Sequence, residues 1–346
     1  GHSVIALGFV AAIPYCRLLH IVAGTANIAL RDFEMGKLAP VSLDDLESKG
    51  YVGTSGLADL SGEQLLALDA CISCGRCQDA CPAHAAGQPL SPRDVVQDIR
   101  RQVNQVSFAQ LLKGGDETVS LHGDVISEET LWACTTCHAC VDACPVDVAP
   151  LEFITDMRRY LVGEGTFRGS AAASLQKMQR TGNPWGLAAQ ERFDWAEGLG
   201  VPTVKENPDF EVLYWVGCAA SYDPRIRKVA RATVKLLQAA DVNFACLGPE
   251  EKCTGDSARR LGDEFLFQEL AEVNVGTLNR YEVIQIITLC PLCLNSLQKD
   301  YELFGGNYEV RHHSVFLHDL VDRGALELEG DTSARTVTYH DHCYLS

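Results

Sequence analysis

Basic residues are scarce in this sequence. It has 29 lysines and arginines against 46 aspartates and glutamates, which leaves a net charge of −17 at pH 7. No cluster of basic residues that could neutralise phosphates stands out, so the composition argues against a nucleic-acid partner. The sequence also shows no constellation of acid, base or nucleophile that would indicate a competing chemistry. We interpret the acidic surplus as a contribution to solubility.

Charged residues are absent from the N-terminal stretch Val4–Cys16, and apolar residues resume after Arg17. The whole stretch is long enough to span a bilayer. A secretory signal peptide is a poorer interpretation, because no basic region precedes the run and Pro14, Arg17 and His20 lie inside it. We therefore predict a transmembrane helix over residues 1–30, with a buried core helix as the alternative.

Two histidines in this stretch are candidate haem b ligands. His2 and His20 are 18 residues apart. That separation is five turns of one helix, so they would face the same side about 27 Å apart. The stretch from His2 to Ile21, with Pro14 and Arg17, resembles the helix of respiratory nitrate reductase gamma subunits that supplies a ligand to each b haem. The alternative for each histidine is a hydrogen-bonded contact between helices, and the partner ligands are expected on other membrane helices.

A modest basic bias follows the apolar stretch, at Arg31 and Lys37, and indicates that this end faces the cytoplasm. We accordingly expect the protein at the cell membrane, with its soluble domains on the cytoplasmic side. Residues 31–60, which are rich in Gly, Asp and Ser, are predicted to be a linker. Because the sequence opens at Gly1 inside an apolar stretch and stops at Ser346 inside a motif, we expect a piece of a longer protein.

Cysteine is abundant by contrast, with 15 in the chain, and two runs share the spacing C-x2-C-x2-C-x3-C-P. The runs are Cys71, Cys74, Cys77 and Cys81, followed by Pro82, and Cys134, Cys137, Cys140 and Cys144, followed by Pro145. This is the spacing of a bacterial two-cluster ferredoxin, in which three thiolates wrap one cubane and the fourth ligates the other. Cluster ligands must be thiolates, which indicates a reducing compartment such as the cytoplasm.

The two runs therefore predict two 4Fe-4S clusters whose ligands cross between the runs. The first cluster is predicted to take Cys71, Cys74, Cys77 and Cys144, and the second Cys134, Cys137, Cys140 and Cys81. Structural zinc, a disulfide framework and c-type haem attachment at the second run are the alternatives. None of them explains eight cysteines in two matching runs with proline after each fourth cysteine. We interpret His138 as a neighbour of the cluster and not as an axial ligand.

Helix signals surround both runs and predict an α-helical ferredoxin domain over residues 61–162. Serine N-caps begin the predicted helices, namely Ser61 with Gln64 as a capping box, Ser91 followed by Pro92, and Ser127 followed by acidic residues. A further helix is predicted over residues 151–161. Residues 163–209 are predicted to form a connection to the next domain.

The hydrophobic period changes from about residue 210 and predicts an α/β domain with a mainly parallel sheet, so the chain is multi-domain. The predicted strands are Val212–Val216, Val242–Cys246, Val283–Leu289 and Thr336–Tyr339, and the predicted helices lie near 224–239, 256–280 and 315–323. Cys246, inside a strand, is predicted to be a core residue. His312 and His313 are interpreted as a satisfied pair on a strand, with a proton-transfer role as the alternative.

Further cysteines stand where these strands end, which is where such sheets gather ligands. Cys218 follows the first strand and Cys290 and Cys293 follow the third, with Cys253 between them in sequence. This order resembles the cysteine-rich CCG domain of heterodisulfide reductases and of related glycerol-3-phosphate and lactate oxidoreductase subunits. The resemblance implies that these four cysteines ligate a third iron–sulfur cluster. Cysteines that merely pack are the alternative.

The sequence departs from the CCG family pattern at two places. Lys252 stands where paired cysteines would begin, so the five-thiolate set of a non-cubane cluster is incomplete, although four thiolates suffice for a cubane. A second motif begins at Tyr339–Leu345 and contains Cys343, which is a candidate ligand without its companions. The CCG domain over residues 210–346 is therefore predicted to be truncated in its second motif.

The stretches Lys252–Gln268 and Phe304–His313 are similar to those of a narrower family, the membrane-bound iron–sulfur proteins that couple electron-transfer flavoprotein to menaquinone. That family joins a nitrate-reductase-gamma-like haem b domain, a two-cluster ferredoxin and a CCG domain in the order seen here. The resemblance implies an iron–sulfur oxidoreductase that takes electrons from a soluble electron-transfer flavoprotein, through its clusters, to haem b and a membrane quinone. The rival is a heterodisulfide-reductase-like, or lactate- or glycerol-3-phosphate-linked, subunit with catalysis at the CCG cluster. A purely structural cluster protein is the third alternative.

Overall fold

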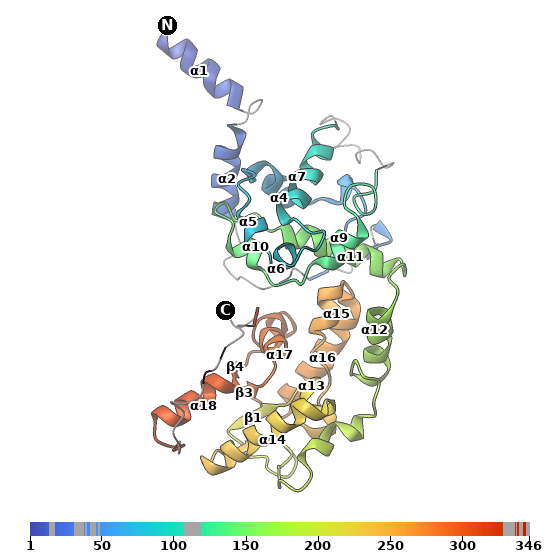
Figure 1. Cartoon of the computed structure of the whole chain (residues 1–346), viewed down its shortest axis with the longest axis vertical. Helices are drawn as coiled ribbons and strands as arrows, with labels where there is room; N and C mark the ends of the chain where they lie inside the picture. Colours follow the sequence, from blue (N-terminus) through green and yellow to red (C-terminus); the bar gives the residue numbers. More distant parts are fainter. Residues whose placement is uncertain are drawn as a thin grey trace. The chain divides into compact units, whose positions relative to one another are not determined.

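The chain divides into two compact units, Gly1–Thr166 and Phe167–Ser346 (Figure 1). The structure is a computed structural model that describes residues 1–13, 18–30, 49–106 and 119–327, with single positions at 38, 40, 41, 46, 47, 336, 338, 342 and 343. The division falls inside the predicted connection, residues 163–209. Each unit has a hydrophobic core of its own.

The first unit is built from helices (Figure 1). The longer ones around its core are α4 (Gly62–Ala70), α7 (Pro92–Val103) and α11 (Pro150–Gly163). Short helices lie around the cysteine runs, namely η2 (Leu57–Asp59), α5 (Arg76–Asp79), α6 (Pro82–Ala85), α9 (Glu128–Ala133) and α10 (Ala139–Asp142). In the described part of this unit, strand pairing is limited to one isolated bridge between His122 and Ile126. The helical composition agrees with the predicted α-helical ferredoxin domain.

The predicted N-caps are confirmed. Ser61 Oγ accepts the N–H of Gln64 at 3.1 Å, and Gln64 Oε1 accepts the N–H of Ser61 at 3.0 Å, which completes the capping box. Ser91 caps α7, and Ser127 caps α9 in the same way. Each cap satisfies an N–H group that the first turn of a helix leaves without an intrahelical partner. The caps therefore determine where α4 and α9 begin, and so where each helix delivers the first cysteine of its run.

The second half of the predicted linker, residues 49–60, packs against the helical unit. Its Thr54 N–H donates to the Asp156 carbonyl of α11 at 3.0 Å, and Leu57 is buried in the core. Gly53 makes this close approach possible, because its φ is +83° and a β-carbon there would lie 2.2 Å from the Asp156 carbonyl oxygen. These residues are therefore part of the folded unit.

The structure contradicts the transmembrane helix predicted for residues 1–30. The apolar stretch contains two helices, α1 (His2–Ala12, 11 residues) and α2 (Leu19–Leu30, 12 residues), and residues 14–17 lie outside the described ranges. At 1.5 Å per residue each helix covers about 16–18 Å, whereas the bilayer core is about 30 Å thick. No helix among the described residues is long and apolar enough to cross a membrane. Pro14 is the sequence signal against one continuous helix, because proline lacks the N–H that the helix ladder needs.

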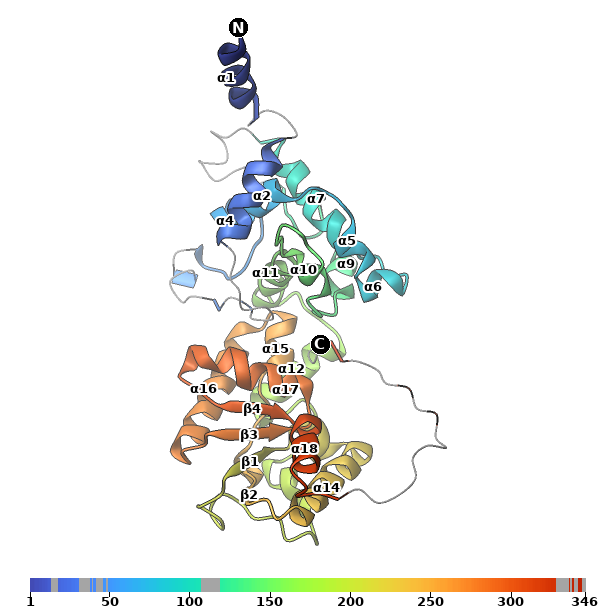
Figure 2. The same cartoon turned by 90° about the vertical axis from the view of Figure 1, so that its left-hand side faces the viewer.

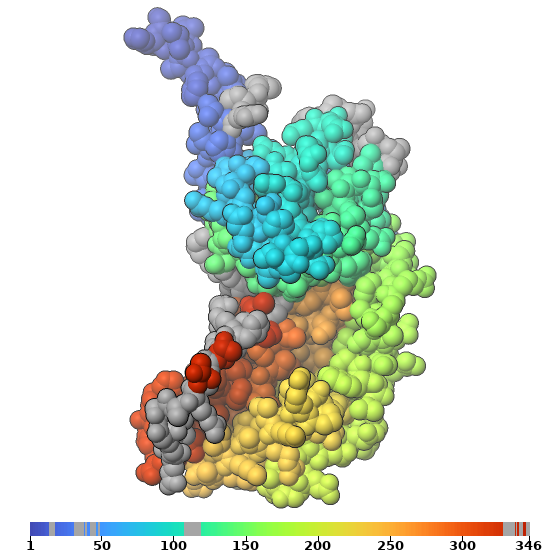
Figure 3. All heavy atoms as spheres, in the orientation of Figure 1, coloured from blue at the N-terminus to red at the C-terminus, as the bar shows by residue number. Residues whose placement is uncertain are grey.

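The two N-terminal helices differ in their packing. No residue of α1 is buried, and Figure 3 shows its side chains exposed at the N-terminal end. In α2, by contrast, Gly24 is buried so closely that a β-carbon there would lie 3.3 Å from Val146 Cγ1. Asn27 Nδ2 donates to the carbonyls of Val146 at 2.7 Å and Asp147 at 3.0 Å. The small and polar residues of α2 therefore hold the loop that follows Cys144.

We expect Asn27→Leu to loosen α2, because the substitution removes a donor that two carbonyl groups share. The expected loss is about 1–3 kcal/mol in the free energy of local opening. Hydrogen exchange of the α2 amides measures this opening directly. Thr25→Val, on the exposed side of the same helix, is the matched control and should leave exchange unchanged. Unchanged protection in Asn27→Leu would contradict the packing role.

The second unit is an α/β domain around a sheet of parallel strands in the order β2-β1-β3-β4. The strands are β1 (Val212–Trp215), β2 (Phe244–Ala245), β3 (Gln285–Thr288) and β4 (Glu309–His312). The α-helices are α12 (Ser170–Thr181), α13 (Cys218–Tyr222), α14 (Pro224–Ala239), α15 (Asp256–Leu261), α16 (Glu264–Arg280), α17 (Pro291–Asn295) and α18 (His313–Asp322). The 3-10 helices are η3 (Ala189–Ala196), η4 (Gly248–Glu250) and η6 (Tyr301–Phe304), and η5 (Ser296–Asp300) is a π-helix.

Both faces of this sheet are covered. Every residue of β1 is buried, which is typical of parallel strands with helices on either side. Tyr214 belongs to one core cluster with Val234 of α14 and Leu320 of α18. Figure 2 shows α14 and α18 on one side of the strands and α16 on the other. The predicted α/β domain with a parallel sheet is therefore confirmed for the described residues.

The structure differs from the predicted elements in two details. The helix predicted over 256–280 is interrupted between α15 and α16 at Gly262, whose φ is +101°, and Asp263 then caps α16 by accepting the N–H of Leu266. Glycine followed by aspartate is a usual stop and start signal. Strand β4 was predicted only as a strand carrying His312 and His313, without bounds, since as an edge strand it is only partly buried and its apolar pattern is weak. The predicted strand Thr336–Tyr339 falls partly on positions outside the described residues.

Candidate metal centres

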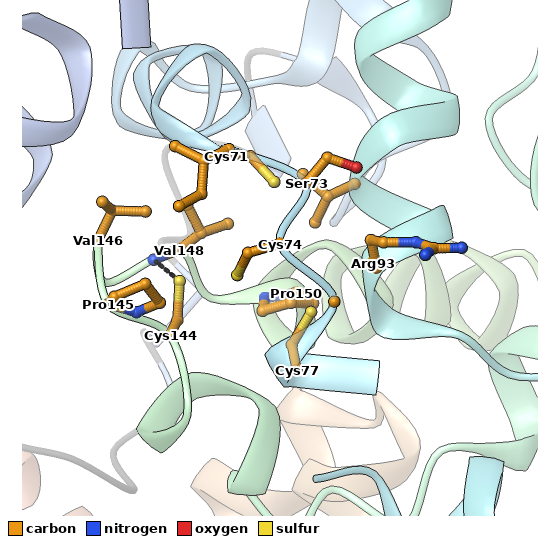
Figure 4. Close-up of a pocket in the computed structure, with 13 residues that line it drawn as sticks. Cys71, Ser73, Cys74, Cys77, Arg93, Cys144, Pro145, Val146, Val148 and Pro150 are labelled. Atoms are coloured by element: carbon orange, nitrogen blue, oxygen red, sulfur yellow. Dashed lines mark hydrogen bonds between the residues drawn. The ribbon is translucent and has the colours of Figure 1, made fainter. Parts of the chain in front are cut away.

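Cysteines from both runs line one cavity in the helical unit (Figure 4). Cys71 ends α4, Cys74 and Cys77 follow it, and Cys144 comes from the second run. Figure 4 shows their sulfur atoms directed toward the space between them, and Val148 N–H donates to Cys144 Sγ at 3.3 Å. The rest of the lining is mainly apolar and includes Ile72, Val96, Pro145, Val146 and Pro150. These are the four cysteines predicted for the first cluster.

The two cysteine loops repeat one unusual backbone conformation. Ser73 and Gly75 in the first run have φ of +54° and +86°, and Thr136 and His138 at the matching positions have φ of +56° and +62°. A left-handed conformation is costly for non-glycine residues, and for a β-branched residue such as Thr136 it is an outlier. Such strain persists where the surrounding structure demands it, typically at ligand sites. The repeated left-handed conformation therefore fits two loops that each surround a cluster.

The remaining cysteines of the runs also lie together. The thiol of Cys134 interacts electrostatically with those of Cys137 and Cys81. The thiol of Cys140 lies near those of Cys134, Cys137 and Cys81 and also near that of Cys77, and Cys81 and Cys140 are buried. The structure thus places Cys81 with the second run and Cys144 with the first, although ligation itself stays a prediction.

Burial and neighbouring thiols make these cysteines hard to ionise. Burial, with Cys71 and Cys144 nearby, raises the pKa of Cys77 to about 11, and burial with other neighbouring thiols raises the pKa of Cys140. Grouped thiolates therefore need a compensating positive charge, which the iron of a cluster would supply. Among the described residues, no three His, Cys, Asp or Glu side chains converge on the position of a single metal ion. The fit to clusters rests on the grouped thiols, the cavity and the loop conformation.

A side chain outside the runs donates to a cysteine sulfur of the first run, and sequence reasoning missed it. Gln97 Nε2 of α7 donates to Cys71 Sγ at 3.1 Å, and Arg100 Nη1 donates to the Cys71 carbonyl at 3.0 Å. Arg93 of the same helix lines the cavity. These three side chains recur at helical spacing on one face of α7, so their periodicity was the available signal.

The second unit gathers its cysteines at the carboxyl ends of strands. Cys218 begins α13 directly after β1, and Cys290 precedes α17 after β3. Cys253 lies in the loop between η4 and α15. The thiol of Cys293 interacts electrostatically with those of Cys290, Cys218 and Cys253. All four predicted CCG cysteines are therefore brought together by the structure.

Gly217 lets these thiols approach one another. Its φ is +80°, and a β-carbon there would lie 3.5 Å from Cys293 Sγ. A hydrogen bond with Cys253 lowers the pKa of Cys218 to about 7, against the effect of burial and with the help of nearby Arg192. One thiol of the group is therefore held partly ionised near neutral pH.

Arg192 and Glu251 are functional candidates that sequence reasoning missed. Arg192 Nη1 and Nη2 each lie 3.5 Å from Cys218 Sγ, and Nη2 also donates to Glu251 Oε1 at 2.7 Å. Both side chains are buried, with exposed fractions of 3% and 2%. Arg192 lies in the predicted connection, and no periodicity or motif around it marks it as part of a site.

The structure also places three other residues of this unit for which the sequence made predictions. Cys246 is fully buried in the core, as predicted. Lys252 is exposed, and its stem passes over Gly182, where a β-carbon would lie 3.2 Å from Lys252 Cγ. Cys343 is exposed, whereas Cys218, Cys253 and Cys293 are buried. Cys343 as a ligand stays a prediction.

The four histidines considered for haem or proton transfer lie in three helices and one strand. His312 Nε2 lies 3.1 Å from the Leu289 carbonyl oxygen and its ring packs on that of His313, with centroids 4.3 Å apart. This geometry agrees with the satisfied role predicted for His312. His2 begins the exposed α1, whereas His20 is half-buried in α2. The five-turn register between His2 and His20 assumed one continuous helix, and the described helices do not provide it.

Two family models match the chain. One, described as a 4Fe-4S dicluster domain, matches residues 70–149 and so includes both cysteine runs. The other, described as a cysteine-rich domain and named CCG, matches residues 212–298 and includes the four cysteines at the strand ends. No solved structure matches the chain.

Several curated proteins are similar along most of the chain. The probable iron-sulfur-binding oxidoreductase FadF of Bacillus subtilis is 39% identical, over 99% of this chain and 54% of the relative. The EtfAB:quinone oxidoreductase of Syntrophomonas wolfei is 36% identical, over 99% and 52%. A probable membrane-anchored ferredoxin of Chromohalobacter salexigens is 40% identical, over 89% and 48%. The chain thus spans about half the length of these relatives.

The family assignment follows from a relative that the chain covers more fully. This relative is one polypeptide of the dihydromethanophenazine:CoB–CoM heterodisulfide reductase of Methanosarcina barkeri, and it is 30% identical over 83% of this chain and 71% of its own length. The shared region includes the cysteine runs and the cysteines at the strand ends, which the two family models match separately. The chain therefore belongs to the family of iron–sulfur oxidoreductases that join a 4Fe-4S dicluster domain to a cysteine-rich CCG domain.

Proposed function

We propose that this chain carries electrons from a soluble electron-transfer flavoprotein toward a membrane quinone. The observation that carries the proposal is the crossed grouping of the eight run cysteines, which fits two 4Fe-4S clusters side by side. One-electron transfer is the chemistry that such clusters supply when bound. The name of the Syntrophomonas relative, EtfAB:quinone oxidoreductase, supports the choice of donor and acceptor.

The two thiol groups of the helical unit differ in their access to solvent. Cys74 is exposed, and the neighbouring Ile72 side chain is 41% exposed. Cys81 and Cys140 are buried. A redox partner can therefore approach the first group, through Cys74, more closely than the second, in which Cys134 and Cys137 are partly buried and Cys81 and Cys140 are buried. Gln97 and the apolar lining of the first cavity place a hydrogen-bond donor and low-dielectric surroundings beside the sulfurs, which are the features that tune a cluster potential.

The strand-end cysteines of the second unit fit one further cubane. Cys218, Cys253, Cys290 and Cys293 supply the four thiolates that a cubane needs. Lys252 does not add to this set, because its side chain is exposed and lies over Gly182. We therefore propose a third cluster of ordinary type and not the non-cubane kind.

Haem b and a position at the cell membrane are further parts of this proposal. Haem b rests on His2 and His20 alone, and the pyridine haemochrome spectrum of the purified protein tests it. A position at the cell membrane, with the clusters on the cytoplasmic side, is supported by the name of the Chromohalobacter relative, a membrane-anchored ferredoxin. Its test is whether the chain sediments with membranes and is released by salt or only by detergent.

Heterodisulfide-reductase-like catalysis at the CCG site is the second candidate. The Methanosarcina relative favours it, because its name includes that activity. The exposed Lys252 in place of a cysteine argues against it, since it leaves the five-thiolate set of the non-cubane cluster incomplete. The two candidates differ in what reduces and oxidises the protein, so one experiment separates them.

The test mixes the anaerobically purified chain with reduced electron-transfer flavoprotein and follows the clusters by electron paramagnetic resonance. We expect cluster signals to appear at the rate of flavoprotein oxidation and to disappear after a menaquinone analogue is added. A variant with Cys71→Ala and Cys134→Ala, which removes a ligand from each ferredoxin cluster, should receive no electrons and is the control. Clusters that dithionite reduces but the flavoprotein does not would contradict the proposal. A new signal that appears only with a thiol substrate analogue would instead support disulfide chemistry.

A further inference from the structure

Arg192 occupies an unusual position for an arginine. It lies in η3, 26 residues before Cys218 in sequence, and only 3% of its side chain is exposed. Two of its nitrogen atoms, Nη1 and Nη2, each donate toward Cys218 Sγ at 3.5 Å. Burying a guanidinium group is costly unless it is paired and hydrogen-bonded. The groups that Arg192 contacts therefore indicate its role.

Glu251 pairs with Arg192 and orients it. Its Oε1 accepts from Arg192 Nη2 at 2.7 Å and from Gly217 N–H at 2.8 Å, and its Oε2 accepts from Val216 N–H at 3.0 Å. The carboxylate therefore connects the guanidinium to the backbone just before Cys218. This arrangement holds the guanidinium with its N–H groups directed at one ligand sulfur, which is a preorganised geometry.

We propose that Arg192 is a tuning residue for the cluster held by the strand-end cysteines, and that Glu251 is its positioning residue. This inference rests on the proposed third cluster. A cubane with its thiolates gains one negative charge on reduction, and N–H donors at a ligand sulfur stabilise that additional charge. Arg192 thereby raises the reduction potential of this cluster relative to a site without it.

The sulfur contact distinguishes Arg192 from an arginine with a purely structural role. Arg231 of α14 provides the comparison, because its Nη1 donates to the carbonyls of Trp195 at 2.6 Å and Glu197 at 2.9 Å, at the end of the same η3. Arg231 therefore holds the segment in place through backbone carbonyls. Substituting Arg231 removes only contacts to backbone carbonyls at the end of η3, whereas substituting Arg192 removes the donors to the sulfur.

The test is a redox titration of the full chain followed by electron paramagnetic resonance, with the variants Arg192→Gln, Arg192→Lys, Glu251→Gln and the control Arg231→Gln. In Arg192→Gln we expect the midpoint potential of the CCG cluster to become more negative, with the two ferredoxin potentials unchanged. Arg192→Lys should give a smaller shift in the same direction, because it retains the charge but loses the fork of donors. Glu251→Gln should also shift the potential negatively, and Arg231→Gln should leave it at the wild-type value.

The outcomes separate this inference from the proposed function. A wild-type protein without any signal from the CCG site contradicts the proposed third cluster. A wild-type signal whose potential is the same in Arg192→Gln overturns the tuning role. If Arg192→Gln does not assemble the cluster, Arg192→Lys decides, and a wild-type potential in that variant overturns the role of the donors.

Discussion

Cys144→Ala is expected to abolish the cluster of the first cysteine run, although Cys144 belongs to the second run. The structure places Cys144 in the cavity lined by Cys71, Cys74 and Cys77, so its removal leaves that cubane with three thiolates. The purified variant should contain about four fewer iron atoms per chain than the wild type. Iron analysis measures the loss, and electron paramagnetic resonance identifies the signal that disappears.

Comparison with Cys71→Ala and Cys134→Ala tests the crossing itself. Cys71→Ala and Cys144→Ala should lose the same signal, and Cys134→Ala should lose the other. Cys246→Ala is the control, because this thiol is buried in the sheet core of the second unit and belongs to neither run, so its loss should leave the iron content unchanged. The crossed assignment is contradicted if Cys144→Ala and Cys134→Ala lose the same signal.

Arg259→Met is expected to cause the largest loss of stability without touching a ligand. Arg259 forms ion pairs with Glu264 at 3.3 Å and Asp300 at 2.8 Å, and all three side chains are at most 2% exposed. Removing the arginine leaves two carboxylates buried without this partner. Breaking a buried ion pair in this way costs about 3–5 kcal/mol in the free energy of unfolding. Urea denaturation followed by circular dichroism measures the change.

The same variant has a predictable pH dependence. Burial raises the pKa of Asp300 to about 6, although Arg259 opposes this effect. A carboxyl whose pKa is higher in the folded state favours folding when protonated, so its contribution to stability falls as pH rises through that range. Without Arg259 the pKa rises further, so the destabilisation should be larger at about pH 7.5 than at about pH 5.5.

Arg280→Met is the matched control for this prediction. Its ion pair with Glu250 lies at 3.4 Å, and the Arg280 side chain is 64% exposed. Exposed ion pairs contribute about 0–1 kcal/mol, so the control should change stability little. Equal losses in the two variants would show that the buried ion pairs of Arg259 are not the source of its effect.

Sequence signals that act within one helical turn predicted the helix starts correctly. The serine caps determined the starts of α4, α7 and α9, because a cap acts within one helical turn. At Gly262 and Asp263 such signals for a helix end and a helix start were also present, but a single helix was predicted over residues 256–280. The prediction for residues 1–30 failed because apolar length and the spacing of His2 and His20 both assumed one continuous helix, whereas the described residues form two short helices and α2 buries small residues.

By itself the sequence indicated the family and predicted the candidate cysteine ligands, because cluster chemistry demands a fixed spacing that few other functions share. Only the tertiary structure decided which side chains surround those ligands. Gln97 and Arg192 reach cysteine sulfurs, and Glu251 reaches Arg192, through contacts between segments far apart in the chain, and such contacts leave no local pattern. Spacing along the chain therefore determines which thiols can share a cluster, while long-range packing determines the charge and hydrogen bonding around it.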